Sequence, residues 1–221
     1  LSSSSAASDV YKRQGNTCAA TEMTAIWWLS FLIYSVSNPA NTSYYPLIPH
    51  SYYVYRSNLG QLTITVVKDT GENNLIRIEK APYGTSKEYL TIQPDGVYCR
   101  GREIKFFIGG TSYWYKPPKP RIKWPLIVDT CWHWYGRKLV NDTSYDAIAT
   151  ISVIGVDTVD VPAGRFICIK LTDELHVSDG THSRSTIWLA PGVGVVKLEA
   201  KCAAKGILGA VQRLLHADTV S

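Results

Sequence analysis

Two stretches in the second half of the chain, Val161–Lys170 and Trp188–Lys197, constrain the fold more than any other part. Each joins a run of β-branched and aromatic residues to a corner made of Pro, Ala and Gly. Glycine adopts the backbone angles that a tight corner needs, and proline is excluded from the middle of a paired sheet. The pattern therefore predicts three antiparallel strands connected by short turns.

Alternation of apolar and polar residues continues through most of the chain. In residues 60–67, for example, Leu62, Ile64 and Val66 share one face and threonines occupy the other. No segment has a long apolar stripe with the helical period, although residues 203–215 are compatible with a short helix. We therefore predict a mainly β, antiparallel protein. The expected strands are 51–56, 60–67, 74–80, 87–93, 96–100, 103–108, 131–135, 145–156, 158–161, 166–171, 182–189, 193–201 and 211–217.

Residues 38–221 are expected to form a single β domain, because this length suffices for one sizeable core and not evidently for two. The proline-rich segment 116–120 divides the domain into halves that open alike, with Pro-Leu-Ile at Pro46 and Pro125 followed by an aromatic strand. One sheet built from two similar halves explains this repeat, and so does chance in an aromatic-rich chain. The prolines in the basic run 116–123 favour a solvated linker over a nucleic-acid surface.

The N-terminal residues are set aside before the fold is considered. Residues 4–14 resemble a translated sequencing adapter, and we interpret residues 1–14 as an artefact. Met23 is the only methionine and precedes an apolar run, so it is the candidate start. Residues 15–22 would then be upstream sequence that is not translated in the natural protein. The alternative is a gene fragment in which Met23 is internal.

Residues 23–37 are predicted to be a signal peptide. Their apolar run, 25–36, has the length of a signal-peptide core and is too short to span a bilayer. Ser35-Val36-Ser37 supplies a small-x-small cleavage pattern, but the segment before the run has no Lys or Arg. The alternative is a hydrophobic first strand or helix. A signal peptide would place the protein in the periplasm or on the cell surface. No other segment is long and apolar enough to predict a transmembrane helix.

Charge and cysteine content exclude some classes of site. The chain has 23 Lys and Arg against 18 Asp and Glu, and the net charge of +5 is spread along the strands. The domain's four cysteines form no Cys-x-x-Cys pair, so neither a zinc ribbon nor a redox motif is indicated. They permit two disulfides or buried free thiols. These cysteines are Cys99, Cys131, Cys168 and Cys202.

Residues 124–200 contain a motif of four parts. It begins with Pro-Leu and an aromatic strand, and continues with Val-Pro-Ala-Gly-x-Phe-x-Cys-x-Lys and Trp-x-Ala-Pro-Gly-Val-Gly-x-Val-Lys. This motif resembles exported bacterial domains of unknown function called TapB-like, which are distantly similar to the LolA/LolB lipoprotein-carrier fold. The sequence departs from that pattern at Val128-Asp129-Thr130, where the family usually has a Gly. The resemblance implies a single strongly curved antiparallel sheet, a half-barrel whose concave face is covered or holds an apolar ligand. The matching residues are Pro125, Leu126, Trp132, Val161–Phe166, Cys168, Lys170, Trp188 and Ala190–Lys197.

The motif residues are interpreted as structural. Prolines and glycines form the corners and bulges, and the aromatic residues supply large buried areas. These structural residues are Pro162, Gly164, Phe166, Trp188, Pro191, Gly192 and Gly194.

One group of polar residues, 173–182, contains two histidines and three acids. If residues 178–181 form a hairpin turn, His176 and His182 would approach each other, but Asp179-Gly180 is first a turn signal. The chain has no nucleophile elbow, P-loop, dinucleotide fingerprint or His-Glu-x-x-His motif. We therefore predict no catalytic residues, no metal site and no cofactor.

The aromatic residues exceed what an aliphatic core needs, and Tyr53, Tyr55, Trp132 and Trp134 are the candidate ligand-binding residues. The first hypothesis is a non-enzymatic domain that binds a lipid-like or other apolar molecule, or an envelope protein partner, on a curved sheet. The second is a structural or adhesive surface module whose sheet is fully packed against itself. The third is a hydrolase of an unrecognised type.

Overall fold

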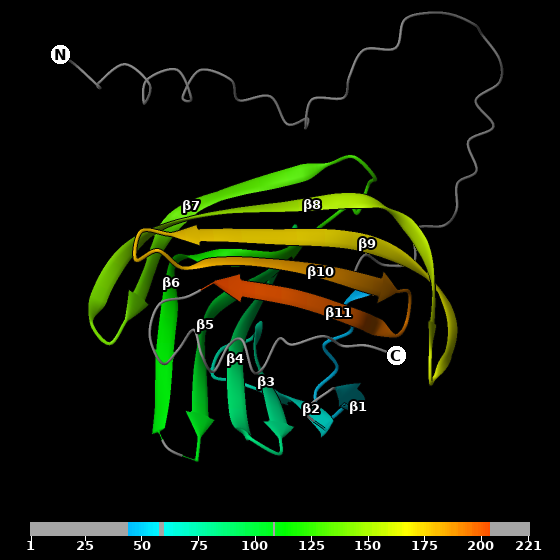
Figure 1. Cartoon of the computed structure of the whole chain (residues 1–221), viewed down its shortest axis with the longest axis horizontal. Coiled ribbons are helices and arrows are strands. Elements are labelled where there is room, and N and C mark those ends of the chain that lie inside the picture. Colours follow the sequence, from blue (N-terminus) through cyan, green and yellow to red (C-terminus); the bar gives the residue numbers. More distant parts are fainter. Residues whose placement is uncertain (1–43, 58–59, 108, 204–221) are drawn as a thin grey trace, which may run out of the picture.

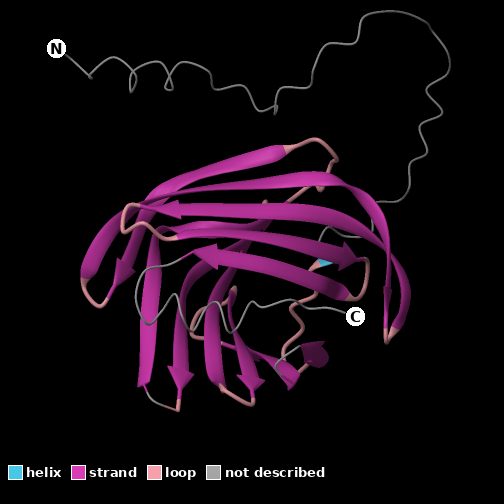
Figure 2. Cartoon of the chain, viewed as in Figure 1, coloured by secondary structure: helices cyan, strands magenta, loops and turns pink. Residues whose placement is uncertain are grey.

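The computed structural model describes residues 44–57, 60–107 and 109–203. The predictions for the adapter-like segment, the start at Met23, the signal peptide and the strand 211–217 lie outside these residues. Within them the chain forms one sheet of 11 antiparallel strands, each paired with its neighbours in sequence (Figure 1). Figure 2 shows almost no helix. The mainly β prediction is confirmed. The strands are β1 (Tyr52–Ser57), β2 (Gly60–Lys68), β3 (Asn74–Ala81), β4 (Gly84–Gln93), β5 (Gly96–Phe106), β6 (Gly109–Lys123), β7 (Cys131–Val140), β8 (Thr143–Val161), β9 (Gly164–Val177), β10 (His182–Ala190) and β11 (Gly194–Ala203).

The proline-rich segment is not a linker, because residues 116–120 lie inside β6. Proline has no backbone N–H, so it is confined to bulges and to strand positions without a partner on that side. Both conditions hold here: the pairing of β6 with β7 ends at Lys116, and the pairing of β5 with β6 shifts register around Cys99. The prolines therefore lie where β6 has lost one neighbour, and Lys119 and Pro120 still pair with β5.

In two places the sequence predicts a pair of short strands, and the structure has one long strand instead. Residues 96–100 and 103–108 fall mainly in β5, and residues 145–156 and 158–161 fall in β8. In β8 the register with β9 shifts between Val153 and Gly155, so a bulge continues the strand where a break was expected.

The Pro- and Gly-rich corners connect strands as expected. Pro162 and Ala163 form a two-residue connection between β8 and β9, in which Val161 pairs with Gly164. Residues 191–193 connect β10 to β11, and Gly192 and Gly194 have φ angles of 74° and 90° there. Residues with a side chain adopt such angles at a cost, which explains the glycines.

The sheet bends so that its two halves share one interior. In Figure 1, β7–β11 run across the top of the molecule and β3–β6 point downward beneath them. The Lys119 ammonium of β6 lies 2.7 Å from the Asp173 carboxylate of β9, three strands away along the sheet. Tyr55 of β1 donates a hydrogen bond of 3.1 Å to the carbonyl of Val195 of β11. The edge strands β1 and β11 do not pair, so the sheet is bent but open. This supports the expected half-barrel only in part.

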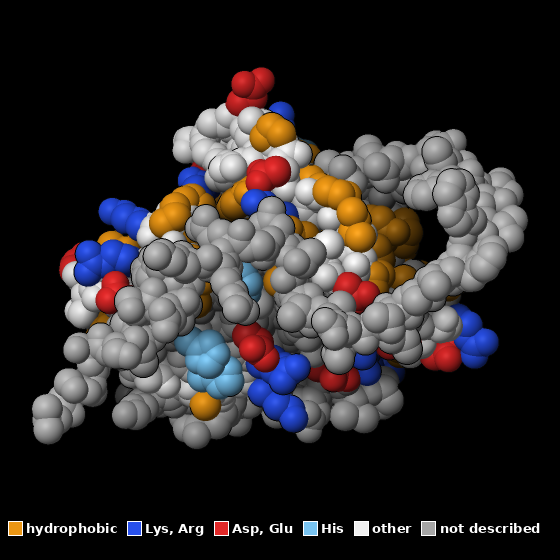
Figure 3. Space-filling view, turned by 90° about the horizontal axis from the view of Figure 1, so that it is seen from above, with side chains coloured by type: hydrophobic (Ala, Val, Ile, Leu, Met, Phe, Trp, Pro, Cys, Tyr) orange, Lys and Arg blue, Asp and Glu red, His pale blue; other side chains and the backbone are white. Residues whose placement is uncertain are grey.

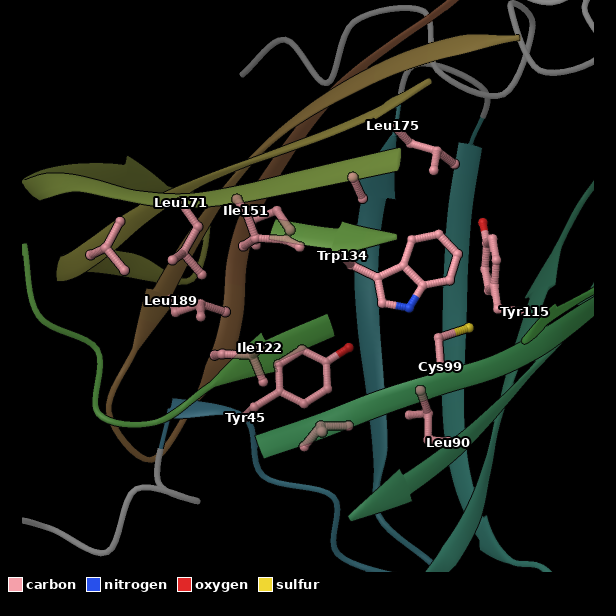
Figure 4. Close-up of a cluster of buried hydrophobic side chains, with 14 of the residues drawn as sticks. Tyr45, Leu90, Cys99, Tyr115, Ile122, Trp134, Ile151, Leu171, Leu175 and Leu189 are labelled. Carbon is pink, nitrogen blue, oxygen red and sulfur yellow. The ribbon is translucent and has the colours of Figure 1, made fainter. Parts of the chain in front are cut away.

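The main core lies on the inner face and draws on both halves. Leu90 and Cys99 come from the first half, and Ile151 and Leu171 from the second; all four are at most 5% exposed. Trp134 meets the Tyr115 ring edge-on at a centroid distance of 5.4 Å (Figure 4). Because burial of apolar area is the main stabilising contribution, this shared core holds the bend.

Cys99 and Cys168 are buried free thiols, so neither forms one of the permitted disulfides. Burial raises the pKa of the Cys99 thiol to about 12 and also raises the pKa of Cys168.

Candidate functional site

A cavity of 1070 Å³ lies between the two halves of the sheet. Its wall takes side chains from the inner face of both halves, including Tyr53 and Tyr55 of β1 and Leu189 of β10. Along β9 the lining extends from Phe166 to Leu175. Nine residue steps in a strand measure about 30 Å, so the cavity is elongated along the strands.

The polarity of the cavity lining changes along β10. From Thr181, just before β10, the lining continues along β10 through Ser183 and Ser185 to Ile187 and Leu189, that is, from hydroxyl to aliphatic side chains. The register places the hydroxyl end beside Asp173 of β9 and the aliphatic end beside Leu171 of β9 and Leu198 of β11. Along β10 the cavity wall is therefore polar toward Thr181 and apolar toward Leu189.

Charged side chains lie on the inner face of β3–β6 and meet one acid from β9. Arg77 of β3 pairs with Glu88 of β4 at 3.0 Å, and Arg121 of β6 lies 3.5 Å from the same carboxylate. Arg102 of β5 forms an ion pair with Glu79 of β3. We call this group the interior charge cluster. Its members are Arg77, Glu79, Glu88, Arg102, Lys119, Arg121 and Asp173.

Strand register explains how the cluster forms. Arg77 lies directly opposite Glu88, and Glu88 lies directly opposite Arg102, so three neighbouring strands present alternating charges on one face. Opposite charges at directly paired positions stabilise a sheet, and like charges there destabilise it. The charges of Arg77, Glu88 and Arg102 are therefore paired within β3–β5, and Asp173 of β9 is an additional acid.

The link between the halves is a buried ion pair. The Lys119 ammonium contacts both carboxylate oxygens of Asp173, at 2.9 and 2.7 Å. Lys119 is 4% exposed and Asp173 is 7% exposed, so both charges are removed from water. Arg121 approaches the same carboxylate at 3.8 Å. A buried charge without a partner is strongly unfavourable, so this contact fixes how the two halves face each other.

The cluster predicts acid sensitivity through Glu88. Burial by itself raises the pKa of this carboxyl, but Arg121 and Arg77 outweigh burial and lower its pKa to about 2, from a usual 4.5. The lowered pKa means that the charged carboxylate stabilises the fold at every pH above about 4.5 and that this contribution is lost as the pH falls toward 2. The shift corresponds to about 3 kcal/mol. We expect urea unfolding to show this loss between pH 5 and pH 2, at about that size.

The matched variant is Glu88→Gln, which cannot titrate. We expect it to be less stable at pH 7 and to have a flatter stability profile between pH 5 and pH 2. An equally steep profile in Glu88→Gln would assign the acid sensitivity to other carboxylates.

Lys138 of β7 is a second buried cation and lies outside the cluster. It lines the cavity, is 2% exposed, and makes no ion pair with any described residue. Its ammonium lies 4.9 Å from the centroid of the Tyr113 ring. Burial lowers the pKa of Lys138. The register pairs it with Tyr115 of β6, which places it on the wall shared by β6 and β7.

The four candidate ligand-binding residues separate into two pairs. Tyr53 and Tyr55 line the cavity, and burial raises the pKa of the Tyr55 hydroxyl to about 12. Trp134 is a core residue, Trp132 packs against the same core, and neither lines the cavity. The indole N–H of Trp134 is buried and has no hydrogen-bond partner among the described residues.

The charged part of this site was not predicted from the sequence. The alternation of residues 74–80 puts Arg77 and Glu79 on the face opposite Ile76 and Ile78. In the structure, the face that carries Arg77 and Glu79 is the interior one. Leu75, which shares the face and is 6% exposed, was the available signal. Lys119 was placed in a solvated linker.

The two histidines of the 173–182 group do meet across the hairpin. His176 pairs with His182, and their rings stack at a centroid distance of 4.2 Å. In residues 44–57, 60–107 and 109–203, no three His, Cys, Asp or Glu side chains gather as a possible metal site.

On the outer surface, acidic and basic side chains are interspersed on the face that Figure 3 shows, with apolar side chains between them. Arg165 and Asp160, for example, form an exposed ion pair at 2.7 Å. The described part of the chain holds no helix of the length and apolarity needed to cross a membrane.

Comparison with known proteins gives a family match over part of the chain. A family model described as DUF3108-like matches residues 140–208, which include β8–β11. The chain is similar to a domain of unknown function in this region. The match overlaps the region of the motif noted above, whereas the TapB-like name and the LolA/LolB similarity stay predictions.

Among solved structures, the chain is similar to a "putative lipoprotein" from Parabacteroides distasonis ATCC 8503. The two are 13% identical with a TM-score of 0.37, over 71% of this chain and 90% of the other. No curated protein matches the chain.

Proposed function

We propose that this protein is a non-enzymatic binding domain that holds an amphipathic molecule inside its bent sheet. The observation that carries the proposal is the elongated cavity between the two halves, whose wall combines charged side chains with a β10 lining that changes from hydroxyl to aliphatic side chains. Its volume of 1070 Å³ is at the upper end of the range of small-molecule sites, which are mostly apolar with a few placed polar groups. A sheet packed entirely against itself, as in a purely structural module, would not enclose this space.

In this proposal the sheet is a half-barrel, and the bound molecule lies against its concave face. Strands β1 and β11 would form the two lips of the half-barrel, where Tyr55 and Val195 meet. It also places the protein in the bacterial envelope, as the predicted signal peptide requires. There an amphipathic molecule such as a lipid needs an apolar enclosure to leave a membrane, because its chain would otherwise be exposed to water.

The test is native mass spectrometry of the purified full chain, before and after incubation with single-chain and double-chain lipids. We expect a reproducible added mass that organic extraction removes. Ala200 lines the cavity from β11, so Ala200→Trp would fill part of it and is expected to abolish the added mass. The control is Ile167→Trp on β9, because Ile167 is 70% exposed and lies outside the cavity wall.

A wild-type protein that takes up no lipid would overturn the proposal and favour a structural or adhesive module. Equal loss of binding in Ala200→Trp and Ile167→Trp would place the bound molecule elsewhere.

A further inference from the structure

The charged side chains on the inner face of the sheet do not balance. The interior charge cluster and Lys138 together hold five cations against three carboxylates, which leaves two positive charges in excess. Removal of a charge from water is unfavourable unless a counter-charge or several hydrogen bonds replace the water. An interior with this excess is therefore suited to a negatively charged group.

The excess positive charge is concentrated at Lys138. Each of the other four cations has a carboxylate within 4 Å, whereas Lys138 has none among the described residues. Its ammonium is on the cavity wall and faces the Tyr113 ring. Two hydroxyl-bearing residues, Thr181 just before β10 and Ser183 on β10, line the same cavity.

A buried guanidinium nitrogen without an acceptor lines the same cavity. The Nε of Arg77 is buried and has no hydrogen-bond partner among the described residues, although Nη1 donates a hydrogen bond to the Tyr45 hydroxyl and Nη2 forms an ion pair with Glu88. Buried polar groups in native proteins are almost always hydrogen-bonded. The wall formed by β3 thus holds one buried donor without an acceptor.

We propose that the ligand is an amphiphile with an anionic head group, such as a carboxylate or a phosphate, which Lys138 binds at the cavity wall while the chain lies toward Leu171 and Leu189. This inference rests on the proposed binding function and adds the charge of the ligand. A charge-assisted bond of an ammonium to an oxyanion is about twice as strong as a neutral one, so the head group should determine selectivity. A head group without charge would leave the Lys138 ammonium unpaired.

The experiment compares three probes with one acyl chain and different heads: tetradecanoate, monotetradecanoylglycerol and tetradecylamine. Each is titrated against the full chain preloaded with the neutral fluorescent probe N-phenylnaphthylamine. We expect tetradecanoate to displace the probe at a concentration about tenfold lower than the neutral glyceride, and the amine to be the weakest. Lys138→Met should remove about that tenfold preference and leave glyceride binding unchanged, whereas Lys138→Arg should keep the preference.

The matched control is Lys80→Met, which removes one positive charge from an exposed position of β3 outside the cavity wall. Equal binding of tetradecanoate and the glyceride by the wild-type protein overturns the inference and leaves the proposed function standing. Retention of the preference in Lys138→Met also overturns it. Failure of all three amphiphiles to displace the probe overturns the proposed function itself. The wild-type comparison needs no variant, so a poorly folded Lys138→Met does not prevent the test.

Discussion

Asp173→Asn is expected to lower the free energy of unfolding by about 3–5 kcal/mol, because it removes one partner of a buried ion pair. The Asp173 carboxylate accepts both hydrogen bonds of the Lys119 ammonium and lies 3.8 Å from Arg121. Loss of its charge would leave two cations in an interior that already has an excess of positive charge. Because the contact joins β6 to β9, the loss would also weaken the packing of one half of the sheet on the other. Urea unfolding at pH 7 measures the effect.

A matched control distinguishes burial from ion pairing as such. Asp160→Asn breaks an ion pair with Arg165 in which both side chains are more than 60% exposed, and it should change stability by less than about 1 kcal/mol. The double variant Lys119→Met with Asp173→Leu should recover much of the loss, because apolar side chains can replace a buried ion pair with little change in stability. A loss in Asp173→Asn no larger than that in Asp160→Asn would show that the two halves are held by the apolar core alone.

Trp188→Ala is expected to destabilise the protein by about 3–5 kcal/mol, the usual range for removal of a buried aromatic side chain. Trp188 is 5% exposed and forms a second, smaller core with Val159, Cys168 and Ala190. This core is separate from the interior one that Ile187 and Leu189 join. The ammonium groups of Lys170 and Lys197 lie 5.1 and 4.7 Å from its ring centroid and so cover the indole.

The matched variants separate packing from hydrogen bonding. Trp188→Phe keeps a ring in the second core and should lose much less stability than Trp188→Ala. Asp157→Asn weakens the acceptor of the indole N–H bond, which is 3.1 Å long, and the 3.8 Å ion pair with Lys170, and should have the smallest effect. Thermal unfolding followed by circular dichroism measures all three. A loss in Asp157→Asn equal to that in Trp188→Ala would mean that the hydrogen bond, and not the buried ring, stabilises this region.

Strands with a regular alternation and glycine corners were predictable from local chemistry. Segment 60–67 matches β2, and the Pro162 and Gly192 corners join β8 to β9 and β10 to β11, because turn residues act over a few positions of the chain. Strand β6 was not predictable in the same way. Its prolines normally break a strand, and only the loss of β7 as a neighbour beyond Lys116 makes them acceptable.

In the candidate site, only the tyrosines of β1 were predicted from the sequence. Tyr53 and Tyr55 are candidates because the aromatic residues exceed what an aliphatic core needs, and both line the cavity. Trp132 and Trp134 were selected on the same grounds but belong to the core. Alternation shows which residues share a face, but not whether that face meets water, a core or a cavity.

The sequence by itself determined the class of fold, the antiparallel pairing of successive strands and the corners of the last hairpins, because these depend on backbone preferences and on residues close together in the chain. Only the tertiary structure decided that the sheet bends, that Lys119 reaches Asp173 across 54 residues, and that Arg77, Glu88 and Lys138 face an interior. A charged residue in an alternating strand is ordinarily taken as solvent-facing. It becomes an interior residue when a distant strand supplies its counter-charge, and that contact depends on the curvature of the whole sheet.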